Sequence, residues 1–180
     1  MELVKKIKEI NIEGEEFIMT FDMRSIATYK EITGTSFNRG ATKLFQYDDE
    51  AVIYFIASTL RRKETPDIPL GNEVVQGDLI YFLLNHTMDV IELIAESLPE
   101  NKNSKKKRET DEDVDLDWMF YAYTTILGKN EDEFWGATPR RVFKQIDIHK
   151  DVNKPRNKNN KSKNGVNEVT GEVTRLKVLD

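Results

Sequence analysis

The sequence contains no cysteine and only two histidines, His86 and His149. Without cysteine the chain has no disulfide, no thiol nucleophile and no thiolate metal site. His86 lies in an apolar stretch three residues before Asp89, and His149 lies near the end of an expected helix. We interpret the first as a structural histidine and the second as a helix-end residue. No nucleophile–base pair is recognisable, so we expect no enzymatic activity, no cofactor and no metal.

Other features are also missing. Gly34, Gly40, Gly71 and Gly77 are isolated, so they predict no glycine-rich phosphate loop. No apolar run approaches the roughly 18 residues that span a bilayer. The opening sequence MELVKKIKEINIEG has neither the apolar core nor the small-residue cleavage site of a signal peptide. We therefore expect a cytoplasmic protein that does not enter a membrane.

The charge balance argues against a dedicated nucleic-acid binder, because the net charge is −5. The basic runs Lys105–Arg108 and Lys150–Lys163 would neutralise phosphates, but no base-reading helix or aromatic–basic interleaving accompanies them. The acidic cluster Asp111–Asp117 lacks the glycine and the distal glutamate of a calcium loop, and we interpret it as solvated.

Composition divides the chain into residues 1–99, 100–114, 115–150 and 151–180. Residues 100–114 contain no large apolar residue before Val114, and a basic block there precedes an acidic one. Such a segment buries too little apolar surface to offset its ordering entropy, so we predict a flexible linker. We expect a mostly disordered basic tail over 151–180. Its last fifteen residues, VNEVTGEVTRLKVLD, alternate too weakly to decide between a strand and a clip on a partner.

Residues 2–21 are predicted to form a β-hairpin around Glu13-Gly14, since β-branched residues and then Phe17, Met19 and Phe21 alternate with polar or smaller neighbours. A helix over Leu3–Ile10 is an open alternative, because its apolar residues also fit a 3.6-residue period.

Four helical segments follow the hairpin. The first is capped by Asp22, runs to Thr33 and stops at Gly34. The others are a short helix in 35–47 interrupted near Gly40, a helix from Asp48 or Asp49 through Arg62, and a long pattern from Asn72 to Leu98 closed by Pro99. The predicted fold is mainly α with a small N-terminal β-hairpin: a helical N-terminal domain, a flexible linker and a small helical C-terminal unit.

We predict that residues 115–150 form that C-terminal unit. Asp115 or Asp117 would cap its first helix and Gly128 would end it. Asn130 would cap a short turn, and Thr138 followed by Pro139 is a typical start for a third helix.

This unit holds both tryptophans and carries aromatic residues on several faces. A unit of about 35 residues rarely buries so much aromatic surface alone. Internal packing and partner binding are both open interpretations, and aromatic residues with arginine nearby are typical of interface hot spots. The candidate partner-binding residues are Trp118, Tyr121, Phe134, Trp135, Thr138, Pro139 and Arg140.

Two motifs carry a resemblance to a known family. The run LGKNEDEFWGATPRRVFKQ resembles the E-F-W-x-x-T-P signature of tail assembly chaperones of long-tailed bacteriophages. The run FDMRSIATYKEITGTSF resembles the opening of a companion family, in which a strand leads into D-M-R-x-aliphatic-x-x-aromatic-K-E-x-T-G. The matching residues of this second motif are Asp22, Met23, Arg24, Tyr29, Thr33 and Gly34.

The resemblance implies a non-enzymatic chaperone in the host cytoplasm that coats the tape measure protein, recruits tail tube subunits and is absent from the mature virion. It also implies self-association of the N-terminal half. Two other interpretations stay open on the sequence: a small DNA-associated regulatory protein that uses the basic C-terminal unit, and a small adaptor of other partners.

Overall fold

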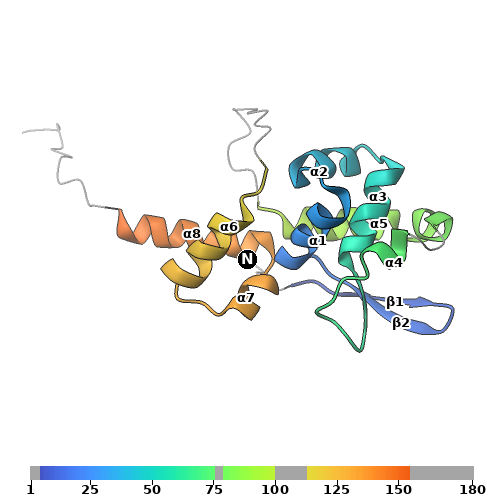
Figure 1. The fold of residues 1–180 in the computed structure, drawn as a ribbon, viewed down its shortest axis with the longest axis horizontal. Coiled ribbons are helices and arrows are strands. Elements are labelled where there is room, and N and C mark those ends of the chain that lie inside the picture. The colour runs from blue at the N-terminus through green and yellow to red at the C-terminus, as the bar shows by residue number, and fades with distance from the viewer. Residues whose placement is uncertain (1–4, 76–78, 100–112, 155–180) are drawn as a thin grey trace, which may run out of the picture.

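The computed structural model describes residues 5–75, 79–99 and 113–154. This part of the chain is mainly α-helical with a small antiparallel sheet near the N-terminus, which confirms the predicted fold class (Figure 1). The strands are β1 (Lys8–Ile12), β2 (Glu15–Met19) and β3 (Leu60–Arg62). The helices are α1 (Met23–Thr33), α2 (Phe37–Phe45), α3 (Asp49–Thr59), α4 (Asn72–Val75), α5 (Leu79–Ser97), α6 (Leu116–Tyr121), the π-helix η1 (Ala122–Ile126), α7 (Glu131–Trp135) and α8 (Pro139–Asn153).

The predicted hairpin is confirmed in β1 and β2. Their register pairs Ile10 with Phe17, and both residues are buried. The turn is made by Glu13 and Gly14, which both have positive φ, and the Asn11 Oδ1 accepts a hydrogen bond from the Gly14 N–H at 3.0 Å. The helical alternative is therefore wrong for the residues of β1.

The predicted helix through Arg62 is too long, because α3 ends at Thr59 and the next three residues form β3. In β3 the residues Leu60 and Arg62 pair with Met19 and Phe17 of β2, so the sheet has three strands in the order β1-β2-β3. Arg61 and Arg62, which were predicted to lie in the last turn of that helix, are instead in an extended strand. One of them, Arg61, is fully buried.

The predicted boundaries of α1 are confirmed. Asp22 accepts a hydrogen bond from the Ser25 N–H at 3.0 Å, and the Ser25 hydroxyl oxygen accepts one from the Asp22 N–H. This reciprocal cap satisfies backbone donors that the first helical turn leaves open. At the other end Gly34 has a φ of 62°, and its N–H donates to the Lys30 carbonyl oxygen. Glycine is favoured at this position because the backbone adopts the left-handed conformation there.

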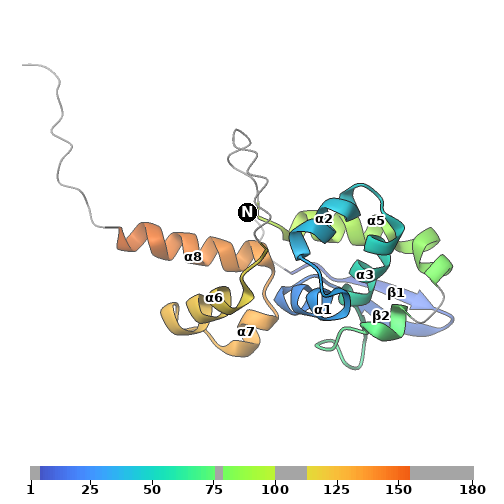
Figure 2. The same ribbon diagram turned by 45° about the horizontal axis from the view of Figure 1, so that its top comes forward.

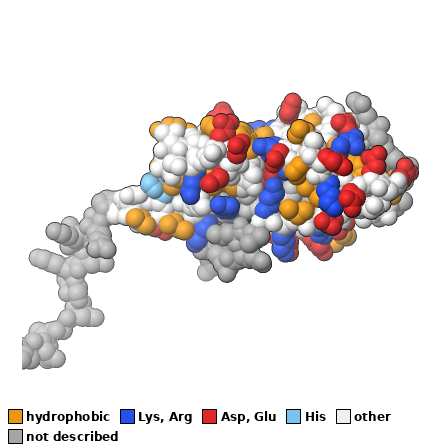
Figure 3. Space-filling model, turned by 90° about the horizontal axis from the view of Figure 1, so that it is seen from below, with side chains coloured by type: hydrophobic (Ala, Val, Ile, Leu, Met, Phe, Trp, Pro, Cys, Tyr) orange, Lys and Arg blue, Asp and Glu red, His pale blue; other side chains and the backbone are white. Residues whose placement is uncertain are grey.

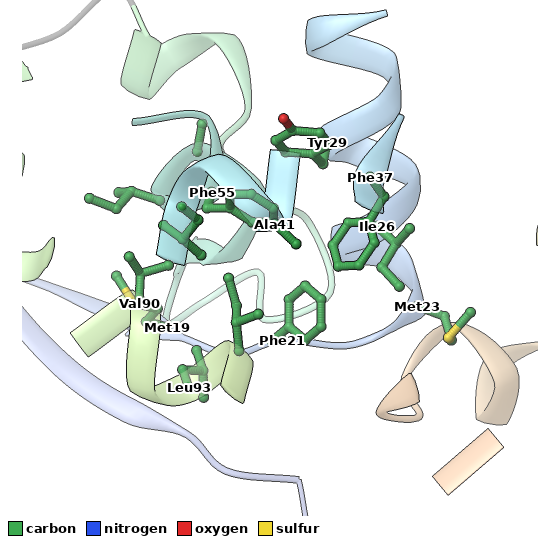
Figure 4. Packing of buried hydrophobic residues seen from close by; sticks show 14 of the residues in the cluster. Met19, Phe21, Met23, Ile26, Tyr29, Phe37, Ala41, Phe55, Val90 and Leu93 are labelled. Carbon is green, nitrogen blue, oxygen red and sulfur yellow. The ribbon is translucent and has the colours of Figure 1, made fainter. Parts of the chain in front are cut away.

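Helix α2 is continuous through Gly40, so the predicted interruption is wrong. A Cβ at Gly40 would overlap the Tyr29 hydroxyl oxygen, and the glycine thus lets the Tyr29 ring lie against the helix. That ring stacks on Phe55 at a centroid distance of 4.4 Å and meets Phe37 edge-on at 6.1 Å (Figure 4). These rings form the centre of the core between α1, α2 and α3.

The other boundaries are close to those expected. Asp48 caps α3, and the long pattern from Asn72 to Leu98 corresponds to α4 and α5, with residues 76–78 outside the described part. Residues 100–112 of the predicted linker also lie outside it. Helix α8 continues to Asn153, so residues 151–153 of the predicted tail are helical, and residues 155–180 are not described.

Helices α6, α7 and α8 lie at one end of the molecule, and the sheet with α1–α5 lies at the other (Figures 1 and 2). Helix α8 extends away from α1–α5 in both views. Figure 3 shows acidic and basic side chains interspersed with hydrophobic ones over one face of the molecule. Buried residues of the two ends belong to one hydrophobic cluster. The division into separate domains stays a prediction, and the structure adds that the two parts are in contact.

Candidate functional site

The C-terminal unit is built from short, individually capped helices. Asp115 caps α6 through the Trp118 N–H at 2.9 Å, and Asn130 caps α7 through the Asp132 N–H at 2.8 Å. Thr138 caps α8 through the Arg141 N–H, and Pro139 occupies the first turn. The predicted helix starts are confirmed. Between α6 and α7 the chain forms the π-helix η1, which the sequence did not predict.

Phe134 is the centre of the unit. It is fully buried, with ring centroids 5.3 Å from Phe120, 5.7 Å from Tyr123 and 4.9 Å from Trp135. The tilted and edge-on geometries of these pairs are those that aromatic quadrupoles prefer. The indole N–H of Trp135 donates to Glu131 at 3.2 Å. Most of the aromatic surface of this small unit is therefore buried by packing within the unit itself.

The seven candidate partner-binding residues divide by exposure. Phe134, Thr138 and Pro139 are buried, so in this conformation they hold the unit together. Trp135 and Arg140 are partly buried. Trp118 and Tyr121 are 42% and 54% exposed. A partner would therefore reach the two exposed α6 residues first.

Within the N-terminal motif, Asp22 forms a buried ionic cluster with two basic residues. It is buried, and its carboxylate receives the Arg61 guanidinium at 2.7 and 2.9 Å and the Lys5 ammonium at 2.7 Å. Burial alone would raise the pKa of Asp22, but the hydrogen bonds and charges of Arg61 and Lys5 outweigh it and lower the pKa. Arg61 also donates to Ser25 and to the carbonyl oxygen of Pro66.

The other motif residues are structural in this fold. Arg24 contacts the carbonyl oxygen and the carboxylate of Asp67, while Thr33 donates through its hydroxyl to the Tyr29 carbonyl oxygen at 2.8 Å. Met23 is fully buried. Its side chain points away from the sheet, toward the ribbon of the C-terminal unit (Figure 4).

The two sequence motifs meet in space. The Met23 N–H donates to the Ala137 carbonyl oxygen at 3.0 Å, which joins the start of α1 to the loop before α8. Beside it, Arg140 donates from Nε to the Leu98 carbonyl oxygen at 2.9 Å. Residues 22–34 and 134–139 were identified independently, and the fold places them side by side.

A further contact holds the chain where it enters α6. The Asp113 carboxylate accepts the Phe37 N–H at 2.9 Å and the Lys30 ammonium at 2.8 Å. Burial would raise the pKa of Asp113, but the Lys30 and backbone hydrogen bonds outweigh it and lower the pKa. Sequence reasoning placed Asp113 in the linker and missed this role, as it missed Arg61. In both cases the partner is far away in sequence and no local pattern marks it.

Metal binding, histidine contacts and membrane-spanning helices are the remaining features of interest among the described residues. Among residues 5–75, 79–99 and 113–154, no group of three or more His, Asp or Glu side chains could hold a metal ion. His86 Nδ1 lies 3.1 Å from Asp89, which also binds Lys8 at 2.8 Å. None of the helices in these ranges is long and apolar enough to cross a membrane.

Comparison with known proteins gives no assignment. No family model, no curated protein and no solved structure matches the chain.

Proposed function

We propose that this chain is a non-enzymatic tail assembly chaperone of a long-tailed bacteriophage. Its partners would be the tape measure protein and the major tail tube protein, with self-association of the N-terminal part. It would act in the host cytoplasm and be lost before the virion is complete. The sequence resemblance of two separate motifs is the starting point of this proposal.

The hydrogen bond from the Met23 N–H to the Ala137 carbonyl oxygen supports treating the two motifs as parts of one functional surface. The exposed Trp118 and Tyr121 lie on α6 of the same unit. Large aromatic residues at the surface are the side chains that binding hot spots favour.

The proposal is tested by pull-down of the tape measure and tail tube proteins encoded beside this chain. We expect the full chain to retain at least one of them, and Tyr121→Ala to weaken retention roughly thirtyfold, as loss of a hot spot of about 2 kcal/mol would. Thr125→Ala, an exposed change in the adjoining η1, is the matched control and should bind fully. Failure of the wild-type chain to retain either protein would reject the proposal.

A further inference from the structure

An apolar groove lies where the two parts of the chain meet. Its volume is about 400 Å³, and it is lined mainly by apolar side chains of α1, α2, α6 and α8 and of the ends of the 99–113 connection. Those that matter here are Phe37, Leu98, Val114, Trp118, Pro139 and Phe143. The volume is in the range of sites that take small ligands or a few side chains.

The two charged residues that line this groove are acidic, and basic residues lie next to them. Its charged lining residues are Asp113 and Asp115. Lys30 pairs with Asp113 from the α1 side, and Lys150 lies over the Trp118 ring at 5.2 Å. Trp118 is nevertheless 42% exposed. Covering such apolar surface is favourable. Asp113 is already paired with Lys30, but the exposed carboxylate of Asp115 favours a covering segment that carries basic residues.

The chain itself contains a segment that combines large apolar residues with basic ones. Among residues outside the described ranges, 100–112 and 155–165 have no large apolar residue. Residues 1–4 are Met-Glu-Leu-Val, with an acidic side chain that suits this rim poorly. Residues 173–178 are Val-Thr-Arg-Leu-Lys-Val, in which Leu176 and Val178 alternate with Arg175 and Lys177. Alternate residues of an extended segment face opposite sides, so the two apolar side chains would enter the groove together.

The chain is long enough for this contact. Helix α8 begins at Pro139 on the groove and has 15 residues, so its end lies ~22 Å along the helix axis. The residues from 155 to 172 span at most about 60 Å when fully extended. We propose that residues 173–178 bind in the groove between α2 and α6/α8, with Leu176 and Val178 in the cavity. Arg175 and Lys177 would lie on the outer side, where their long side chains can reach the rim at Asp115.

Such a contact is made within the chain, and it does not depend on the proposed function. It buries part of the Trp118 ring. Because residues 173–178 are linked to the groove by the chain, their effective concentration is high and even weak contacts suffice for binding.

Trp118 fluorescence gives a direct test in the full chain. Trp135→Phe makes Trp118 the only tryptophan and provides the parent protein. Acrylamide quenching of Trp118 should rise at least twofold in Leu176→Asp, while Val166→Asp, the same kind of change outside the proposed contact, should match the parent. A synthetic peptide of residues 166–180 should restore protection to the Leu176→Asp protein, and a scrambled peptide should not. Equal quenching in parent and Leu176→Asp would overturn the proposal.

A cysteine pair distinguishes the intramolecular contact from one between two copies, since the native chain has no cysteine. Asn38 lines the groove and is exposed, so Asn38→Cys with Leu179→Cys should form a disulfide within one chain under mild oxidation. Asn38→Cys with Asn167→Cys is the control and should react several-fold less. A product that is mainly disulfide-linked dimer would overturn the proposal, because the occupant would then be a second copy.

Discussion

Arg61 and Asp22 form a fully buried ion pair that joins β3 to the start of α1. Two guanidinium nitrogens of Arg61 contact two carboxylate oxygens of Asp22 at 2.7 and 2.9 Å, across 39 positions of sequence. The two side chains are 0% and 1% exposed. A charge buried this deeply is tolerated only with its partner in place. The pair therefore explains why residues 60–62 leave the helical path that local sequence predicts.

The first prediction is that Asp22→Asn destabilises the chain by about 3–5 kcal/mol, because Arg61 stays buried without its counter-charge while asparagine can still cap α1. Denaturant unfolding at pH 7 measures the loss. Arg62→Gln is the control, since Arg62 pairs with Glu15 and Glu73 at the surface and should cost less than about 1 kcal/mol. Equal midpoints for the two variants would contradict the prediction.

The same pair predicts an acid dependence. The Asp22 pKa is lowered from its usual 3.8, so its contribution to stability is fully present above that value and is lost as the pH falls through the lower folded-state pKa. We expect the free energy of unfolding of the wild type to fall below about pH 4. Since an asparagine side chain does not titrate, the profile of Asp22→Asn should fall less steeply there.

The second prediction concerns Gly40→Ala in α2. Helix propensity alone would make this change stabilising by about 1 kcal/mol. The new Cβ would instead overlap three atoms of the Tyr29 ring and hydroxyl group. We expect a net loss of about 1–3 kcal/mol in thermal or denaturant unfolding. Thr42→Ala, at an exposed position of the same helix, should stay within about 0.5 kcal/mol of the wild type.

The third prediction is that Tyr123→Phe stabilises the C-terminal unit. Tyr123 is fully buried, and its hydroxyl oxygen has no hydrogen-bond partner among the described residues. Removing an unsatisfied buried hydroxyl should raise the free energy of unfolding by about 1 kcal/mol. Tyr121→Phe is the matched control, since it removes an exposed hydroxyl in α6 and should change the free energy of unfolding by less than about 0.5 kcal/mol. A destabilised Tyr123→Phe protein would indicate a partner for that hydroxyl.

Local signals predicted much of this fold from sequence. Asp22, Asp48 and Thr138 each have a short oxygen-bearing side chain before an apolar period, and each caps the helix expected of it. Caps act over three residues, so sequence shows them directly. Tertiary contacts decide the rest: Arg61 is extended because of Asp22, and α2 is continuous because Gly40 fits the Tyr29 ring. Neither Asp22 nor Tyr29 could have been identified as the partner from the residues next to Arg61 or Gly40 in sequence.

The candidate site shows the same limit. Aromatic content correctly marked residues 115–150 as unusual, but it did not separate the fully buried Phe134 from the exposed Tyr121. The π-helix η1 shifts the phase of the side chains between α6 and α7, and no pattern in the sequence indicated it. The contacts of Asp113 and Met23 with the opposite part of the chain carry no signature in sequence, because each depends on how two distant segments dock.

The fourth prediction is that protease cleavage occurs first within Lys105–Arg108, in the predicted linker, and leaves the two fragments associated. The fragments would be held by the Met23–Ala137 hydrogen bond, the Asp113 contacts and the shared apolar surface. Co-elution of both fragments from a sizing column at pH 7 is the expected result. Separate elution would show that the contact is too weak to hold the parts together.

In the cleaved protein, Asp113→Ala should weaken association of the fragments about fivefold, which corresponds to ~1 kcal/mol for a partly exposed carboxylate. The Asp113 pKa is lowered, so the wild-type association should also weaken as the pH falls below about 4. Asp117→Ala, an exposed change in α6 close to Asp113 in sequence, is the control and should leave association unchanged.

The fifth prediction separates the structural from the partner-binding role of adjacent residues. Phe134 has no exposed surface, so Phe134→Ala should cost about 3–5 kcal/mol and unfold the C-terminal unit. Trp135 packs on Phe134 and Phe120 and is only partly buried, so Trp135→Ala should cost about half as much. Circular dichroism at about 25 °C should then show a folded Trp135→Ala protein that binds the tape measure or tail tube protein at least roughly thirtyfold more weakly. If that folded protein binds both at full strength, Trp135 is only a packing residue, and the partner surface lies elsewhere.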